Sequence, residues 1–320
     1  MKRMRFHLPP CEREAFFLVG PTASGKSAVA QYLAERCAAA ILSADAMQVY
    51  RGLDIGTAKP SAAERARVRY YGLNLIDFHE PFSVAAYRRS ALQAVHEVAA
   101  RKQPLIVVGG TGLYIKSLTD GLATGAPPQL SIRLAGERLL AAEGVGALQD
   151  WLRRVAPESF AALADQNNPR RLIRALEKAL AGQPPAPRNW SASEKCPLWS
   201  TAELYARIQS RVEAMFTGGL LAEVEQVLHS GLELSPTARA AIGYAEAMAC
   251  LRGECSLEDA KARTVLRTRQ LAKRQTTWFR HQCHVAWLAV DATMTLGQIA
   301  EMVWAYWQKH GPTPMAGGDR

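Results

Sequence analysis

One short segment near the N-terminus constrains this chain more than any other. Gly20–Ser27 reads GPTASGKS and fits the pattern G-x-x-x-x-G-K-[S/T], a loop that cradles phosphate groups. The apolar run Ala15–Val19 before it predicts a buried strand, and Ala28–Ala34 after it has the apolar spacing of a helix. Strand, loop and helix in this order are the context that the pattern requires.

The residue types in this loop suit a bound anion. Gly20 and Gly25 permit backbone angles that side chains would forbid, so the loop amides and the helix N-terminus can converge on one negatively charged group. Lys26 adds a positive charge, and the Ser27 hydroxyl suits Mg²⁺. The pattern identifies neither the phosphate compound nor the reaction. The predicted phosphate-binding residues are Gly20, Pro21, Thr22, Ala23, Ser24, Gly25, Lys26 and Ser27.

Two further apolar runs end in polar residues that can reach the same place. Ala39–Ser43 leads to Asp45, and Pro104–Val108 leads through two glycines to Thr111. Ligands of a parallel sheet bind beyond the carboxyl ends of its strands, so we expect both side chains beside the phosphate loop. A helix N-cap is the alternative role for a lone aspartate after a strand. The alternation of strands and helices here predicts a doubly wound, P-loop NTPase-like α/β sheet.

Composition changes along the chain predict its division into parts. Pro- and Gly-rich segments near residues 125 and 185 read as linkers around a helical stretch, and the last third is again helical. The predicted parts are a leader (1–14), the first core segment (15–124), a helical insertion (125–195), a helical and basic second core segment (196–308) and a disordered tail (309–320).

Positive charge is concentrated near the C-terminus. The net charge is +10, and residues 260–290 hold seven basic residues without a single Asp or Glu. An ordinary solvated basic helix would normally carry compensating carboxylates, so the stretch favours contact with nucleic acid. No apolar run is long enough to span a membrane, and six scattered cysteines without a C-x-x-C pair are typical of reduced thiols in the cytoplasm.

Seven segments, in order, resemble the tRNA dimethylallyltransferase (IPP transferase) family of the bacterial type. The resemblance covers about residues 15–290. The chain departs from the family's usual residues at Ala46, Leu73, Asn74, Thr201 and Ala245. The segments are Gly20–Ser27, Ser43–Gly52, Asp54–Pro60, Val108–Tyr114, Asn168–Glu177, Ile242–Tyr244 and Arg269–Arg280.

The resemblance implies a reaction. A dimethylallyl group would pass from its diphosphate to the exocyclic N6 amine of the adenosine 3′-adjacent to the anticodon, in tRNAs that read codons starting with U. The phosphate loop would hold the diphosphate leaving group with Mg²⁺ at Ser27. Asp45 would act as general base, Arg211 would stabilise the leaving charge, and Thr111 would contact the extruded nucleotide.

The resemblance also implies the partners, which are dimethylallyl diphosphate and the anticodon arm of tRNA, and we expect the enzyme to act as a monomer. The residues expected to bind tRNA are Asp45, Ala46, Met47, Gln48, Thr111, Arg133, Arg170, Arg171, Leu172, Ile173, Arg174, Gly243, Tyr244, Arg267, Arg269, Lys273 and Arg274.

Other functions remain open on the residues alone. An adenylate dimethylallyltransferase would share the phosphate loop but has no use for the insertion or the basic stretch. A small-molecule kinase would use Leu73–Asp77 as a strand ending in a metal-binding carboxylate. A non-catalytic RNA-binding protein would need only the basic surface.

Overall fold

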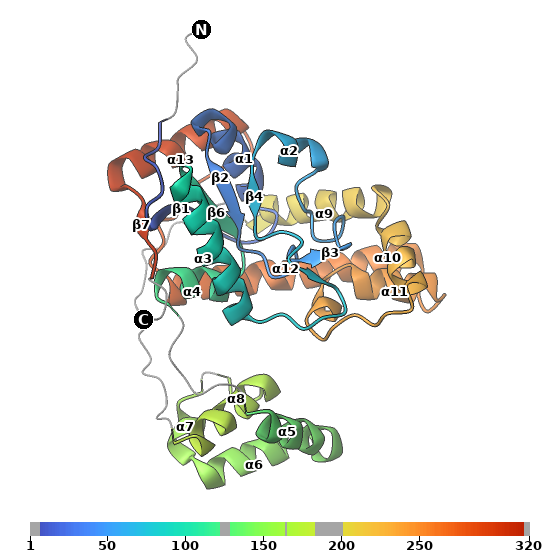
Figure 1. Cartoon of the computed structure of the whole chain (residues 1–320). Coiled ribbons are helices and arrows are strands. Elements are labelled where there is room, and N and C mark those ends of the chain that lie inside the picture. The colour runs from blue at the N-terminus through green and yellow to red at the C-terminus, as the bar shows by residue number, and fades with distance from the viewer. Residues whose placement is uncertain (1–6, 122–128, 164, 183–200, 317–320) are drawn as a thin grey trace. The chain divides into compact units, whose positions relative to one another are not determined.

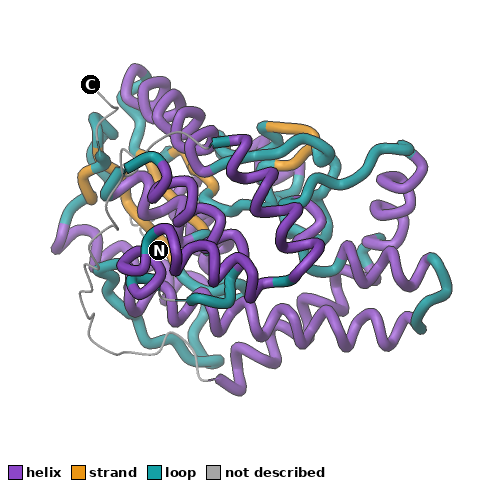
Figure 2. Tube along the Cα trace, turned by 90° about the horizontal axis from the view of Figure 1, so that it is seen from below, coloured by secondary structure: helices purple, strands orange, loops and turns teal. Residues whose placement is uncertain are grey.

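The computed structural model describes residues 7–121, 129–163, 165–182 and 201–316, and the chain forms two compact units (Figure 1). The larger unit comprises residues 1–122 and 191–320, and the smaller comprises 123–190. The smaller unit is therefore one continuous segment that interrupts the sequence of the larger. Helices make up most of the described chain (Figure 2).

A five-stranded sheet in the order β4-β2-β6-β1-β7 forms the centre of the larger unit. The first four strands are parallel, and β7 is antiparallel to β1. This arrangement confirms the predicted doubly wound α/β sheet. Its strands are β1 (Glu14–Val19), β2 (Ala40–Ser43), β4 (Tyr70–Tyr71), β6 (Leu105–Gly109) and β7 (Thr313–Pro314).

Helices cover both faces of this sheet, which is why its strands are continuously apolar. Successive side chains of a strand point to opposite faces. Ile41 and Ile106 therefore pack in one cluster with α1 and α13, whereas Leu42 and Val107 pack in another with α3, α4 and α12. These helices are α1 (Lys26–Cys37), α3 (Val84–Ala100), α4 (Gly112–Thr119), α12 (Leu257–Gln282) and α13 (Leu296–His310).

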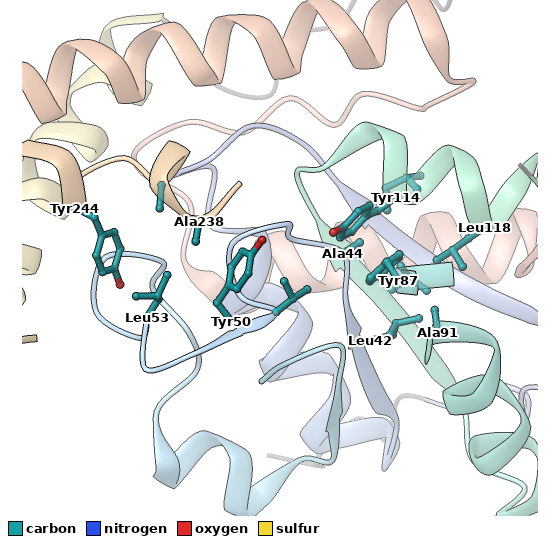
Figure 3. Close-up of a cluster of buried hydrophobic side chains, with 14 of the residues drawn as sticks. Leu42, Ala44, Tyr50, Leu53, Tyr87, Ala91, Tyr114, Leu118, Ala238 and Tyr244 are labelled. Atoms are coloured by element: carbon teal, nitrogen blue, oxygen red, sulfur yellow. The ribbon is translucent and has the colours of Figure 1, made fainter. Parts of the chain in front are cut away.

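The second of these clusters continues away from the sheet. Figure 3 shows it running from Leu118 and Tyr87 to Tyr244, past Tyr50 and Leu53. This extension joins the sheet to further helical elements of the larger unit. These are α9 (Thr201–Thr217), α10 (Leu220–His229), the 3₁₀ turn η1 (Ala238–Ala240) and α11 (Tyr244–Leu251). The short helix α2 (Ala62–Arg67) contributes no buried residue.

The run Leu73–Asp77 does not join the main sheet as the sequence suggested. Only β5 (Ile76–Asp77) is a strand, and it pairs with β3 (Tyr50–Arg51) in a separate two-stranded ribbon. Asp77 forms an ion pair with Arg51 at 3.0 Å. β6 occupies the place next to the phosphate-loop strand, so the kinase alternative loses its main support.

The smaller unit is a helical module with its own core. Asn168 caps α8 through its side chain, and Pro169 occupies the first helical turn. Leu148, Leu152 and Leu172 are fully buried where the helices meet. The helices are α5 (Leu130–Glu143), α6 (Val145–Val155), α7 (Pro157–Ala161) and α8 (Pro169–Leu180).

The described parts of the predicted leader and tail are more ordered than the sequence indicated. The predicted loose leader buries Leu8, and the predicted disordered tail continues as α13 and then as β7, which pairs with β1. The Met315 amide donates to the Arg13 carbonyl at 2.9 Å. Pro314 is tolerated because an edge strand can lack one donor. Residues 1–6 and 317–320 lie outside the described ranges.

Candidate active site

The phosphate loop joins β1 to α1 as predicted. Gly25 caps α1 at φ 85°, a left-handed conformation that glycine adopts without strain. The Lys26 ammonium donates to the Pro21 carbonyl at 3.1 Å. Burial lowers the pKa of Lys26 to about 8; Asp45 opposes this shift and Arg211 adds to it. The loop thus holds a poorly solvated cation that an anionic ligand would stabilise.

Two arginines of α9 approach the loop. Arg207 donates from Nε to the Ala23 carbonyl at 2.8 Å, and its guanidinium lies over Gly25. Arg211 follows one turn later, and burial lowers its pKa while Asp45 opposes the shift. Only Arg211 was expected at the site. The spacing of four between the two arginines was the signal that could have identified Arg207, because residues four apart share a helix face.

Asp45 and Thr111 lie together just beyond the ends of β2 and β6. The Thr111 hydroxyl accepts a hydrogen bond from the Ala46 amide at 2.9 Å, and the Thr111 amide donates to the Ala44 carbonyl at 3.1 Å. The Asp45 carboxylate accepts from the Met47 amide at 2.9 Å. This bond resembles the capping role considered above, yet Asp45 also faces Lys26 and Arg211.

Two stacked tyrosines of the core contact the end of β2. The rings of Tyr87 and Tyr114 lie parallel at 3.8 Å (Figure 3). The Tyr87 hydroxyl donates to the Ser43 carbonyl at 2.9 Å. The backbone that carries Asp45 is therefore held from the core as well as from Thr111.

These groups line one cavity of about 550 Å³. Lys26, Asp45, Thr111 and Arg211 are among its polar lining residues, while Met47, Met215, Ile242 and Leu271 supply apolar surface. Two neighbouring cavities of about 510 and 240 Å³ share Lys26, Ser27 and Arg211 with each other. The cavity therefore holds cationic groups that can bind an anion. The same cavity also contains a carboxylate and apolar surface.

A carboxylate that the sequence did not single out, Glu223, holds another loop that lines this cavity. Glu223 of α10 accepts hydrogen bonds from the amides of Asp54 and Ile55 at 2.9 and 2.8 Å, and from the Tyr244 hydroxyl. The loop that it holds supplies Gly56 to the cavity. A side chain at Gly56 would collide with the Tyr244 ring, because a Cβ would lie 2.4 Å from it.

The basic stretch forms α12, and part of its charge is compensated. Arg267 pairs with the nearly buried Glu246, and Lys261 pairs with Glu213 at 2.9 Å. The expectation that no carboxylate is available was wrong, because other helices and the first turn of α12 itself, outside the acid-free stretch, provide them. Arg269 lies over the Tyr205 ring at 4.7 Å.

Other members of the expected set are more open to contact. Lys273 and Arg274 of α12 are exposed, and Arg274 lines the cavity with Arg267. In the helical module, Arg170 and Arg171 are exposed. Arg133 and Arg174 instead share the fully buried carboxylate of Glu177, at 3.0 and 2.8 Å.

Several residues expected to contact RNA have structural positions instead. Leu172 and Ile173 belong to the core of the module. Gln48 is buried between Ser43 and the carbonyls of residues 57 and 58, and Gly243 and Tyr244 are buried at the start of α11. The side chains of Leu172, Ile173, Gln48 and Tyr244 thus pack within the protein.

Two further observations concern metal binding and membrane insertion. In residues 7–121, 129–163, 165–182 and 201–316, no group of three or more His, Cys, Asp or Glu side chains could hold a metal ion. Within the same residues, no helix combines the length and apolarity needed to cross a membrane.

Comparison with known proteins agrees with this geometry. A family model described as IPP transferase matches residues 48–282. A tRNA dimethylallyltransferase from Nocardia farcinica is 42% identical over 279 residues, which cover 85% of this chain and 88% of the relative. One from Geobacter sulfurreducens is 41% identical over 283 residues, which cover 85% and 91%. The crystal structure of the full-length tRNA isopentenylpyrophosphate transferase from Bacillus halodurans is 33% identical, with a TM-score of 0.67 over 93% of this chain and 98% of that chain.

Proposed function

Because this chain belongs to the IPP transferase family, we propose that it transfers the dimethylallyl group of dimethylallyl diphosphate to the N6 amine of the adenosine 3′-adjacent to the anticodon, in tRNAs reading codons that start with U. The carbon–oxygen bond of the diphosphate ester breaks and a carbon–nitrogen bond forms. The products are N6-(dimethylallyl)adenosine in tRNA and free diphosphate.

The phosphate loop receives the leaving group. Negative charge grows on the diphosphate as its bond to carbon breaks, and fixed donors and cations at that position lower the barrier. Lys26 and Arg211 line two of the cavities at the loop, and Arg207 reaches the loop at Ala23. We assign these three side chains to the stabilisation of diphosphate.

Asp45 receives the proton of the acceptor. The exocyclic amine of adenine must lose a proton as it is alkylated, and a positioned carboxylate is a suitable base. Thr111 holds the backbone at Ala46, next to Asp45, and the Met47 amide donates to the Asp45 carboxylate itself. An adenosine stacked in an anticodon loop must leave the stack to reach this cavity, and the apolar wall with Met47 offers it a surface.

Mg²⁺ fits the same place. Ser27 and Asp45 line one cavity with Lys26, and hydroxyl and carboxylate oxygens together with diphosphate oxygens are ligands that Mg²⁺ prefers. When bound, the ion would neutralise charge on the diphosphate. Ser27 would hold it, and the substrate would complete its coordination.

The acceptor RNA requires cationic surface outside the cavity. We assign Lys273 and Arg274 on α12 and Arg170 and Arg171 on α8 to RNA phosphates, because these side chains are exposed. We also propose that the enzyme acts as a monomer in the cytoplasm, where the five cysteines of the described residues stay reduced.

The observation that carries the proposal is the placement of Asp45 and Thr111 in one cavity with Lys26 and Arg211. Mass spectrometry of tRNA nucleosides, after expression in a strain that lacks the modification, tests it. We expect N6-(dimethylallyl)adenosine with the wild type and a strongly reduced level with Asp45→Asn. Prenylation of free AMP but not of an anticodon stem-loop would favour the adenylate enzyme, and phosphoryl transfer from labelled ATP would favour a kinase.

A further inference from the structure

The side chain of Gln275 on α12 bridges two loops of the candidate active site. Gln275 accepts a hydrogen bond from the Thr22 amide of the phosphate loop at 2.8 Å, through Oε1. Its Nε2 donates to the Gly110 carbonyl at 3.0 Å. The phosphate loop and the Gly109–Thr111 turn are thus joined through one amide group.

The surrounding packing leaves little freedom for this bridge. A Cβ at Gly110 would lie 2.4 Å from Nε2 of Gln275, so a side chain at this position would displace the Gln275 amide from its present place. Three residues further along α12, Trp278 covers Gly112, where a Cβ would lie 2.0 Å from the indole ring. Two successive contacts of one helix therefore lie against the middle of this turn and against the first residue of α4.

One of the two bridged loops serves the prenyl donor, and the other serves the acceptor amine. The phosphate loop is assigned to the departing diphosphate, and Thr111 holds the backbone next to Asp45, which is assigned to the acceptor amine. We propose, on the basis of the function given above, that Gln275 is a positioning residue that sets the separation between donor and acceptor. Gln275 makes its contacts through the two loops, and we assign it no contact with the reacting atoms.

The chemistry of the amide explains why glutamine suits this position. The bridge needs one acceptor for an N–H and one donor for a C=O, separated by a single carbon, and a primary amide offers both. Methionine has a similar length but leaves both backbone groups unpaired. An ionised glutamate would accept from the Thr22 amide, but its second oxygen could not donate to the Gly110 carbonyl. A protonated glutamate would again have a donor for that carbonyl.

The first test separates positioning from binding. Misplacement of reacting groups by about 1 Å can cost on the order of 100-fold in rate, so we expect Gln275→Met to lower kcat between roughly tenfold and 100-fold. The KM values for dimethylallyl diphosphate and for an anticodon stem-loop should change little. The exposed Gln226 of α10 provides the matched control, and Gln226→Met should behave as the wild type.

The second test uses Gln275→Glu in the same assay. The ratio of its kcat to that of the wild type should rise as the pH falls, because protonation restores the donor, while the ratio for Gln275→Met should stay constant. The other ionisable side chains that line this cavity are Lys26, Asp45, Arg211, Arg267 and Arg274. They are present in both proteins, so the ratio to wild type removes their contribution.

Three results would overturn the inference. These are an unchanged kcat in Gln275→Met, a raised KM at constant kcat, and a kcat loss matched by an equal loss of folded protein in thermal unfolding. An inactive wild type would instead refute the proposed function, so failure of the function and failure of the inference are distinguishable.

Discussion

The depressed pKa of Lys26 predicts how donor binding depends on pH. Burial lowers this pKa from 10.5 to about 8 in the free enzyme, and only the charged ammonium attracts a diphosphate. A bound diphosphate favours the charged form and raises the pKa again. The affinity for the diphosphate is therefore highest well below pH 8. It declines as the pH rises through 8, because Lys26 must then take up a proton when the ligand binds.

The size of the effect follows from a single linked proton. At a pKa of about 8, the charged fraction falls from about 90% at pH 7 to about 10% at pH 9, so the Kd for dimethylallyl diphosphate should rise about tenfold over that interval. Calorimetric titration of the enzyme without RNA, where the donor is not consumed, measures this change.

Two variants isolate the contribution of Lys26. Lys26→Arg keeps its charge throughout the interval and should show less than about a twofold change, which also reports any titration of the ligand itself. Lys26→Met should bind weakly and without this pH dependence. A wild type whose Kd rises no more steeply than that of Lys26→Arg would refute the assignment of the cation to Lys26.

Three further predictions concern other parts of the molecule. Asp45→Asn should lower the rate of single-turnover prenylation by about 10²- to 10⁴-fold without a change in thermal midpoint, and a rate within a few-fold of wild type would exclude it as the base. Leu172→Ala should destabilise the helical module by about 2–5 kcal/mol, seen as faster hydrogen exchange confined to α5–α8; unaltered exchange there would contradict the core assignment. Gly112→Ala forces its Cβ against Trp278 and should cost about 1–3 kcal/mol of overall stability. Gly146→Ala, whose Cβ meets nothing within 4 Å, is its control, and equal thermal midpoints for the two would show that the contact with Trp278 relaxes freely.

The sequence predicted where three parts of the candidate site lie, because short spacing encodes their placement. The phosphate loop is recognisable because all its ligands are consecutive, and Asp45 and Thr111 are recognisable because parallel strands end at the same edge of a sheet. Resemblance to a family added Arg211, whose placement beside Asp45 no local pattern could indicate.

The residues that the sequence did not single out act across long separations. Glu223 binds the amide of Asp54, and Gln275 binds that of Thr22. A glutamate or glutamine on an amphipathic helix has the same local pattern whether it faces solvent or a distant loop. The ion pair of Arg267 with Glu246 escaped prediction for the same reason, because its carboxylate comes from another helix.

The pairing of β1 with β7 has a consequence for synthesis of the chain. Among the described strands, β1 leaves the ribosome first and β7 last, so the edge of β1 at Glu14 and Ala15 stays open during nearly the whole of translation. Its apolar strand is then a template for pairing with other chains, and contacts so distant in sequence form slowly. Truncation of the last residues from Thr313 onward should therefore affect yield and aggregation during expression before it affects the chemistry at the phosphate loop.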